Sequence, residues 1–245
     1  MPGSSACILH PAPSTAMPRN ATHISRITRS KEAARTSYDR ISKWYDALAE
    51  PSERQCREKG LQRLGAAAGE ILLEIGFGTG HSVAALARSV GKSGKVYGID
   101  ISEGMLNVTQ ARVNEAGLSE RVDLQLGDAV DLPFEPGSFD ACFMSFTLEL
   151  FDTPEIPAVL CECQRVLRDG GRICVVAMSR KGRAGVMVRL YEWAHKIFPN
   201  YVDCRPIFLQ QAMEDTGFQI VDATQMTMWG LPVEVVLARC PPPVL

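Results

Sequence analysis

The chain has 245 residues and a mass of 26.8 kDa, a length that suits one large α/β domain better than two. Its 26 basic and 28 acidic side chains give a formal net charge of −2, which argues against nucleic acid or an anionic membrane as the main partner. The apolar runs are too short to cross a bilayer, so we expect no transmembrane segment. Eight cysteines do not form a disulfide scaffold in a chain of this length, and buried reduced thiols such as Cys142 and Cys174 favour the cytoplasm.

Residues 1–31 differ in composition from the rest of the chain. They contain no acidic residue, but four basic residues, several prolines and many hydroxyl side chains. No apolar core of a secretory signal is present. Three interpretations stay open: a transit peptide that directs the protein to a mitochondrion or plastid, a disordered tail, or an over-extended start with Met17 as the true initiator.

Residues 32–65 are predicted to form an N-terminal helical lid. Apolar side chains recur at helical spacing from residue 32 to about residue 48, where Pro51 is expected to break the helix. A second, short helix carries Leu61 and Leu64 and ends before Gly65.

Strands and helices then alternate. Ser102 is expected to cap one helix, and Thr153 another with Pro154 at its first position, ended by Gly170 and Gly171. Apolar runs predict strands at residues 71–75, 95–100, 121–126, 139–146 and 173–178.

The C-terminal part departs from this alternation. A helix at residues 207–216 is followed by strands at 218–226 and 231–238, which only a short turn through Trp229 separates. That connection is too short for a parallel crossover and fits a hairpin. The predicted fold is therefore α/β: a doubly wound, mostly parallel seven-stranded sheet closed by an antiparallel hairpin, within one domain at residues 32–240.

The sequence Glu74-Ile75-Gly76-Phe77-Gly78-Thr79-Gly80 follows the first strand. Glycines at alternate positions allow a tight turn and a close approach of the backbone to a ligand. The spacing differs from the dinucleotide fingerprint, and the acidic residue before the loop would repel a pyrophosphate but suit an ammonium group.

Two further carboxylates follow the next strands. Asp100 ends the second strand, where it can accept hydrogen bonds from both hydroxyls of a ribose. Asp128 follows the third strand, where it can accept one from the amino group of an adenine. Taken singly, each residue could also be a helix cap or a turn residue. Together they describe a nucleoside with a zwitterionic appendage, which is S-adenosylmethionine.

With these motifs the chain resembles the class I S-adenosylmethionine-dependent methyltransferases. It is most similar to the menaquinone/ubiquinone-biosynthesis C-methyltransferase group and its small-molecule relatives. The resemblance covers about residues 35–240 and implies the Rossmann-like methyltransferase fold. After the fourth strand the chain has Thr147-Leu148-Glu149-Leu150-Phe151, where the quinone enzymes usually have a Gly-Leu-Arg-Asn-type segment. Its other motifs are Gly98-x-Asp100-x-Ser102, Gly127-Asp128-Ala129, Leu132-Pro133-Phe134, Ser138-Phe139-Asp140 and Arg165-Val166-Leu167-Arg168-Asp169-Gly170-Gly171.

The resemblance also implies roles for single residues. Glu74 orients the amino group of the cofactor, Asp100 holds the ribose, and Ser145 and Phe146 lie near the transferring methyl group. In full, the implied cofactor-binding residues are Tyr38, Tyr45, Glu74, Gly76, Phe77, Gly78, Gly80, Asp100, Ile101, Met105, Asp128, Ala129, Ser145 and Phe146. The two tyrosines lie on the lid, where packing on the edge of the sheet is the alternative.

Residues 183–216 are expected to cover the acceptor. They contain Tyr191, Trp193 and Phe198 as candidate pocket residues and His195 as a candidate base, although packing is the alternative for these side chains. Glu149 is a weaker candidate for a catalytic group. A base is needed only if the acceptor must lose a proton. No metal-ligand spacing is present.

The predicted function is therefore transfer of a methyl group from S-adenosylmethionine to a small-molecule acceptor, apolar or aromatic, at carbon, oxygen or nitrogen. A quinone-like ring is one such acceptor. The alternatives are a nicotinamide-dependent oxidoreductase on a Rossmann sheet and a protein that binds the cofactor without turnover. The sequence determines neither the acceptor nor the oligomeric state.

Overall fold

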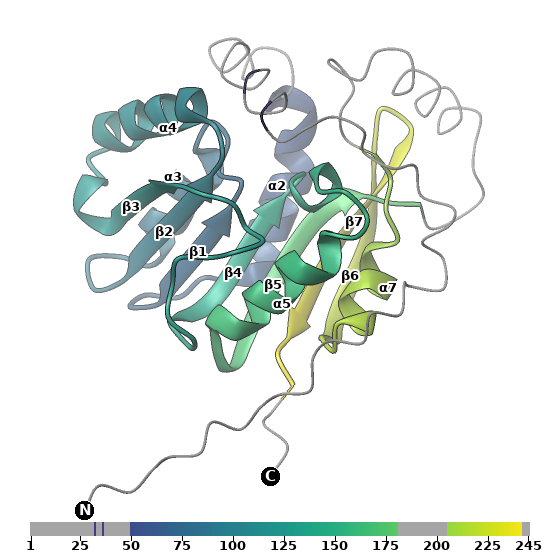
Figure 1. Ribbon diagram of the computed structural model, residues 1–245. Helices are drawn as coiled ribbons and strands as arrows, with labels where there is room; N and C mark the ends of the chain where they lie inside the picture. The colour runs from purple at the N-terminus through teal and green to yellow at the C-terminus, as the bar shows by residue number, and fades with distance from the viewer. Residues whose placement is uncertain (1–31, 33–35, 37–49, 181–204, 242–245) are drawn as a thin grey trace, which may run out of the picture.

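A computed structural model describes residues 50–180 and 205–241, together with Glu32 and Thr36 (Figure 1). The N-terminal tail, most of the first predicted helix and the aromatic part of the predicted acceptor cover lie outside these residues. Within the described ranges no helix combines the length and the apolar character needed to cross a bilayer.

The strands form one seven-stranded sheet in the order β3-β2-β1-β4-β5-β7-β6. The first five run parallel, and β7 is antiparallel to both of its neighbours. This arrangement confirms the predicted fold class. The strands are β1 (Ile71–Ile75), β2 (Lys95–Asp100), β3 (Val122–Leu126), β4 (Phe139–Ser145), β5 (Leu167–Met178), β6 (Gln219–Met228) and β7 (Leu231–Arg239).

Helices cover both faces of the sheet and give the protein two apolar cores. One core contains side chains of α2 (Glu50–Leu64), α3 (His81–Ser89) and α4 (Glu103–Glu115). The other contains side chains of α5 (Ile156–Val166) and α7 (Leu209–Asp215). In Figure 1, α5 and α7 lie in front of the sheet and α2 lies behind it. The central strands β1 and β4 and the second half of β5 are nearly continuous apolar runs, as expected for strands that are buried on both faces, whereas the edge strands β3 and β6 are partly exposed.

The order of the strands determines where a ligand binds. From β1 the chain adds β2 and β3 on one side and then returns to add β4 and β5 on the other. The carboxyl ends of β1 and β4 are therefore a topological switch point, where open α/β sheets leave a crevice for ligands.

The sequence placed the start of α5 too early. Thr153 does not cap the helix, because Glu155 N–H and Ile156 N–H both bond to the carbonyl of Asp152 and form a turn there. The hydroxyl of Thr153 instead accepts a hydrogen bond of 2.9 Å from Nη1 of Arg205. The helix begins at Ile156.

The end of α5 also differs from the prediction. The helix ends at Val166, and β5 begins at Leu167 and continues through the two glycines that were expected to end the helix. The carbonyl of Gly171 accepts a hydrogen bond of 3.0 Å from Cys240 N–H, so this stretch pairs as a strand. Pairing with a distant segment overrides the local glycine signal.

Other boundaries follow local chemistry. Ser102 caps α4 as predicted, with its hydroxyl accepting from Met105 N–H at 3.1 Å. Helix α2 is longer than expected and includes Pro51, which is tolerated in a first helical turn. The hairpin turn consists of Trp229 and Gly230, both at positive φ, as a type I′ turn requires.

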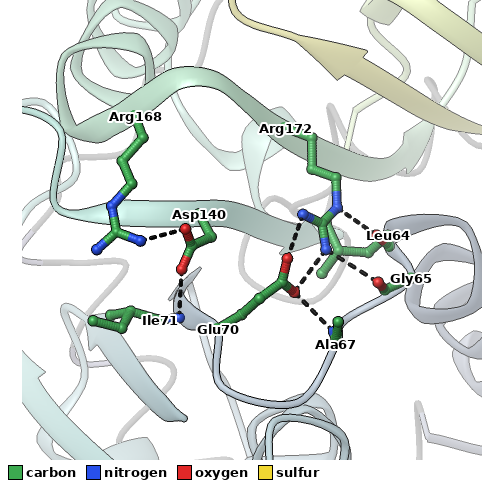
Figure 2. Close-up of polar contacts among 8 residues, drawn as sticks. All are labelled: Leu64, Gly65, Ala67, Glu70, Ile71, Asp140, Arg168 and Arg172. Atoms are coloured by element: carbon green, nitrogen blue, oxygen red, sulfur yellow. Dashed lines mark hydrogen bonds and ion pairs between the residues drawn. The ribbon is translucent and has the colours of Figure 1, made fainter.

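An ion pair at the amino edge of the sheet fixes the end of α2 (Figure 2). Arg172 on β5 binds both carboxylate oxygens of Glu70 at 2.8 Å. It also donates to the carbonyls of Leu64 and Gly65 at 2.7 and 3.1 Å, and Glu70 accepts from Ala67 N–H at 2.8 Å. The last turn of α2, the start of β1 and β5 are thereby joined at the edge opposite the switch point.

Candidate active site

The glycine loop after β1 has the geometry that its sequence predicted. Gly76, Gly78 and Gly80 have φ values of 70°, 50° and 81°, which favour glycine. A Cβ on Gly76 would lie 2.3 Å from Cγ2 of Thr147, whereas a Cβ on Gly78 would meet nothing within 4 Å among the residues that the structure describes. Gly76 is therefore required by packing, while Gly78 borders open space that a ligand can fill.

Asp100 connects this loop to β2. Its Oδ2 accepts a hydrogen bond of 3.0 Å from Gly78 N–H, and its Oδ1 accepts one of 3.0 Å from Ser102 N–H. Its carbonyl accepts a third, also of 3.0 Å, from Gly127 N–H in the loop after β3. The structure thus brings together the three motifs from which the sequence predicted a nucleoside site.

Helix α4 supports the loop through residues that the sequence analysis did not identify. Thr109 donates to the carbonyl of Gly78 at 2.7 Å, and a Cβ on Gly80 would lie 2.5 Å from Cγ2 of Thr109. Arg112 donates from Nε to the carbonyl of Thr79 at 2.7 Å. These partners are 29 to 33 residues from the loop along the chain, so no local pattern indicates them.

Glu74, at the end of β1, is a buried carboxyl group with 2% of its surface exposed. Burial raises its pKa well above the ordinary value, although a hydrogen bond with Ser82 and the charge of Arg57 oppose this. Its Oε2 has no hydrogen-bond partner in the described part of the chain. A buried carboxyl oxygen that can still accept a hydrogen bond is a suitable partner for the amino group of the expected cofactor.

The residues expected around the adenine lie after β2, on α4 and in the loop after β3. Met105 and Ala129 are buried at 2% and 3% exposure, and Ile101 is partly exposed. Oδ1 of Asp128 accepts a hydrogen bond of 3.2 Å from Val130 N–H, so this carboxylate also closes a turn. Their contact with an adenine ring stays a prediction. Phe77 is buried at 3% exposure, and its contact with the cofactor also stays a prediction.

The end of β4 carries local backbone strain. Phe146 has a φ of 53°, rare for a residue with a side chain, and it ends the strand one residue earlier than predicted. Its N–H donates to the carbonyl of Val176 at 2.8 Å, which holds it against β5. Such strain persists where the surrounding structure enforces it, often at functional sites. Ser145, the last residue of β4, is partly exposed beside it.

A second buried carboxyl group lies beyond this point. Glu149 belongs to η3 (Leu148–Leu150) and has 0% of its surface exposed. Oε1 accepts a hydrogen bond of 3.0 Å from Met178 N–H, and Oε2 has no partner within the described residues. Burial raises the pKa of Glu149 to about 8. From the sequence Glu149 was only a weaker candidate for a catalytic group, because its burial and its bond to Met178 depend on distant segments.

Several predicted site residues lie outside the described residues: Tyr38, Tyr45, Tyr191, Trp193, His195 and Phe198. Their roles stay predictions. Among the residues that the structure describes, no group of three or more His, Cys, Asp or Glu side chains could hold a metal ion.

The site as a whole suits one kind of ligand. Its backbone turns and Asp100 offer partners for a ribose, and two buried carboxyl groups flank the switch point between β1 and β4. A ligand with cationic groups would favour ionisation of these carboxyl groups and be stabilised by them, whereas an anionic pyrophosphate would gain no such stabilisation. The residues present therefore fit S-adenosylmethionine.

Comparison with known sequences agrees with this geometry. Residues 72–171 match the family described as "Methyltransferase domain". Demethylmenaquinone methyltransferase of Symbiobacterium thermophilum is 36% identical over 166 residues, which cover 64% of this chain and 65% of that protein. The Bacillus subtilis enzyme of the same name is 30% identical over 166 residues, 66% of this chain and 70% of that protein. Nocamycin O-methyltransferase of Saccharothrix syringae is 38% identical over 136 residues, 56% of this chain and 48% of that protein.

Solved structures share the fold at lower identity. The [4+2]-cyclase SpnF superposes with a TM-score of 0.72 at 19% identity, covering 89% of this chain and 98% of that one. A SAM-dependent methyltransferase from Aquifex aeolicus superposes with a TM-score of 0.62 at 22% identity, covering 82% and 98%. At these identities the likeness establishes the architecture and not the reaction.

Proposed function

Because this chain belongs to the class I S-adenosylmethionine-dependent methyltransferases, we propose that it transfers the methyl group of S-adenosylmethionine to a small apolar or aromatic acceptor, at carbon, oxygen or nitrogen. The observation that carries the proposal is the convergence of Gly78, Asp100 and Glu74 at the switch point of the sheet. The nicotinamide alternative has no support from these residues, since an anionic pyrophosphate would gain no electrostatic stabilisation from buried carboxyl groups.

The cofactor site is divided among the loops. Glu74 would hold the amino group, Asp100 the ribose hydroxyls, and the loop around Asp128 the adenine edge. The sulfonium of the bound cofactor supplies an activated methyl group. The protein then has to align donor and acceptor, exclude water and receive any proton that the acceptor loses.

Two observations support a small ring-bearing or apolar acceptor. The curated relatives include demethylmenaquinone methyltransferases and nocamycin O-methyltransferase by name, although the matches span only 48–70% of their length. The segment between β5 and α7 also carries Tyr191, Trp193 and Phe198, aromatic side chains suited to an apolar pocket.

The acceptor is proposed as a class, and not as a quinone, for a chemical reason. Where the quinone enzymes usually have Gly-Leu-Arg-Asn, this chain has Thr-Leu-Glu-Leu, and Glu149 is the buried residue in that segment. An acidic side chain thus stands where those enzymes usually have a basic one.

The experiment that tests this function has two stages. Calorimetry with S-adenosylhomocysteine and NAD should show binding of the first and none of the second. Incubation with S-adenosylmethionine labelled in its methyl group, together with a panel of phenols, hydroquinones and amines, should then transfer the label to one chemical class. Equal affinity for NAD would overturn the proposal, and cofactor binding without transfer to any acceptor would favour a protein without turnover.

The contribution of the acceptor cover is tested separately. Trp193→Ala and His195→Ala are expected to change the rate or the preferred acceptor while cofactor affinity stays within a few-fold, since one buried contact of the acceptor contributes about 1–3 kcal/mol. A pH–rate profile that loses one limb in His195→Ala would identify the histidine as a base. Loss of cofactor binding in both folded variants would instead assign this segment to the cofactor site.

A further inference from the structure

Glu149 lies between the ends of two adjacent strands at the ligand-binding edge. Its backbone follows β4 within a few residues, and its carboxyl group is held by Met178 N–H at the last residue of β5. The side chain is fully buried. The fold thus places a carboxyl group directly beneath the carboxyl edge, on the β4 and β5 side of the switch point.

The same segment contacts the cofactor loop. Thr147 donates to the carbonyl of Gly76 at 3.4 Å and to that of Ser145 at 3.1 Å, and the missing Cβ of Gly76 leaves the space that Thr147 occupies. Glu149 is two residues further along. Since Ser145 and Phe146 are expected near the transferring methyl group, the nearby buried carboxyl group lies on the methyl-transfer side of the site.

The environment of Glu149 favours its neutral form. Desolvation is the largest influence on its pKa, and the negative charge of Glu53 on α2 acts in the same direction. Hydrogen bonding from Met178 N–H and the positive charge of Arg205 act in the opposite direction without cancelling the effect. Oε2 has no hydrogen-bond partner within residues 50–180 and 205–241. A cation that enters the site would stabilise the ionised form of Glu149.

We propose, on the premise of the methyltransferase function above, that Glu149 senses the charge on the cofactor's sulfur atom. The carboxyl group is protonated in the free protein, and it releases its proton to solvent when the sulfonium of S-adenosylmethionine occupies the site. S-adenosylhomocysteine has a neutral thioether and leaves the carboxyl group protonated. Once the methyl group has left, the carboxylate takes up a proton again, so the site favours the cofactor over the product.

Glu74 is the competing source of a proton, and the choice of ligands separates the two residues. Glu74 is also buried, but it is expected to face the amino group, which both ligands carry. Any proton that Glu74 releases therefore appears with both ligands. The difference between the two ligands reports on the group that responds to the sulfonium.

The test is isothermal titration calorimetry of the full chain at about pH 7 in phosphate and in Tris, whose ionisation enthalpies differ. The slope of the binding enthalpy against the ionisation enthalpy gives the number of protons released. We expect S-adenosylmethionine to release about one proton more than S-adenosylhomocysteine. At about pH 9.5, where a group with a pKa of about 8 is already ionised, the difference should vanish.

Glu149→Gln identifies the source of the proton, because its amide oxygen can still accept from Met178 N–H. This variant should bind S-adenosylmethionine without releasing the additional proton. The ratio of its affinities for S-adenosylmethionine and S-adenosylhomocysteine should be about tenfold lower than in the wild type. Glu120→Gln, at an exposed glutamate on η2 (Ser119–Arg121), is the matched control and should behave as wild type. Glu74→Gln should change proton release equally for both ligands.

Three outcomes would overturn the proposal: equal proton release with both ligands in the wild type, a difference that survives in Glu149→Gln, or one that persists at about pH 9.5. If Glu149→Gln does not fold, Glu149→Asp replaces it and should shift the pH at which the difference disappears; an unchanged profile would contradict the assignment. No acceptor is needed, so failure to find one leaves this test intact. Absence of binding by either ligand would contradict the cofactor site itself.

Discussion

The backbone N–H of Gly78 donates a hydrogen bond of 3.0 Å to Oδ2 of Asp100, so the last residue of β2 holds the loop that follows β1. The other carboxylate oxygen holds Ser102 N–H at the start of α4. One side chain therefore shapes the glycine loop, and the same side chain is the one that we expect to hold the ribose.

Asp100→Ala is expected to weaken binding of S-adenosylhomocysteine roughly ten- to a hundredfold. Hydrogen bonds to a charged acceptor contribute about 1.5–3 kcal/mol, which corresponds to that range of affinity. Calorimetry measures the affinity, and circular dichroism verifies that the variant is folded. Asp123→Ala, which removes a half-exposed carboxylate on β3, serves as the control and should bind normally. Normal binding by folded Asp100→Ala would show that the ribose lies elsewhere.

Gly76→Ala should destabilise the protein more than Gly78→Ala does. Both residues have positive φ, which costs about 1–2 kcal/mol for a residue with a side chain. Only at Gly76 would the new methyl group also overlap Thr147, and such overpacking costs about 1–3 kcal/mol more. Urea unfolding of the two variants measures the difference.

Gly78→Ala is expected to keep most of its stability and to lose affinity for the cofactor, because its methyl group enters the open space beside the loop. Combining Gly76→Ala with Thr147→Ala should restore part of the lost stability. Equal destabilisation by the two glycine variants would contradict the packing role of Gly76.

The free energy of unfolding should depend on pH through Glu149. Its pKa is raised to about 8 in the folded protein from an ordinary value of 4.5, so between these values the folded chain binds more protons than the unfolded chain. Stability is therefore expected to fall as pH rises from about 4.5 to about 8 and to level off above, by about 1.4 kcal/mol for each unit of pKa difference.

Urea unfolding of wild type and Glu149→Gln at several pH values tests this slope. The difference between the two unfolding free energies should shift in favour of the variant as pH rises toward about 8. Glu74 acts in the same direction, so the wild-type slope alone is not diagnostic. A difference that is independent of pH would show that Glu149 is ionised in the folded protein.

Arg172→Ala should cost clearly more stability than Arg168→Ala. Arg172 binds both oxygens of Glu70 with its side chain mostly buried, and it also bonds to two carbonyls at the end of α2 (Figure 2). Loss of such hydrogen bonds costs about 1.5–3 kcal/mol. Arg168 pairs with Asp140, but its side chain is 44% exposed, so its removal should cost less than about 1 kcal/mol. Thermal unfolding of both variants gives the comparison, and similar losses would contradict the role of Arg172 in fixing α2.

The sequence by itself determined the sheet, the glycine loop and the position of Asp100. These features depend on local rules: apolar runs form buried strands, and alternating glycines follow a strand where the backbone needs positive φ. The short connection through Trp229 likewise restricts the last two strands to a hairpin. Each of these signals lies within a few residues of the feature that it predicts.

Only the tertiary structure decided which residues support the site. Thr109 and Thr147 contact the glycine loop from positions 31 and 71 residues away, and Met178 binds Glu149 across 29 residues. The observed start of α5 differs from the predicted start for the same reason, since Arg205 binds Thr153 from a distant segment. Burial and hydrogen bonding depend on which surfaces meet, and the raised pKa of Glu149 exists only because the folded chain removes that carboxyl group from water.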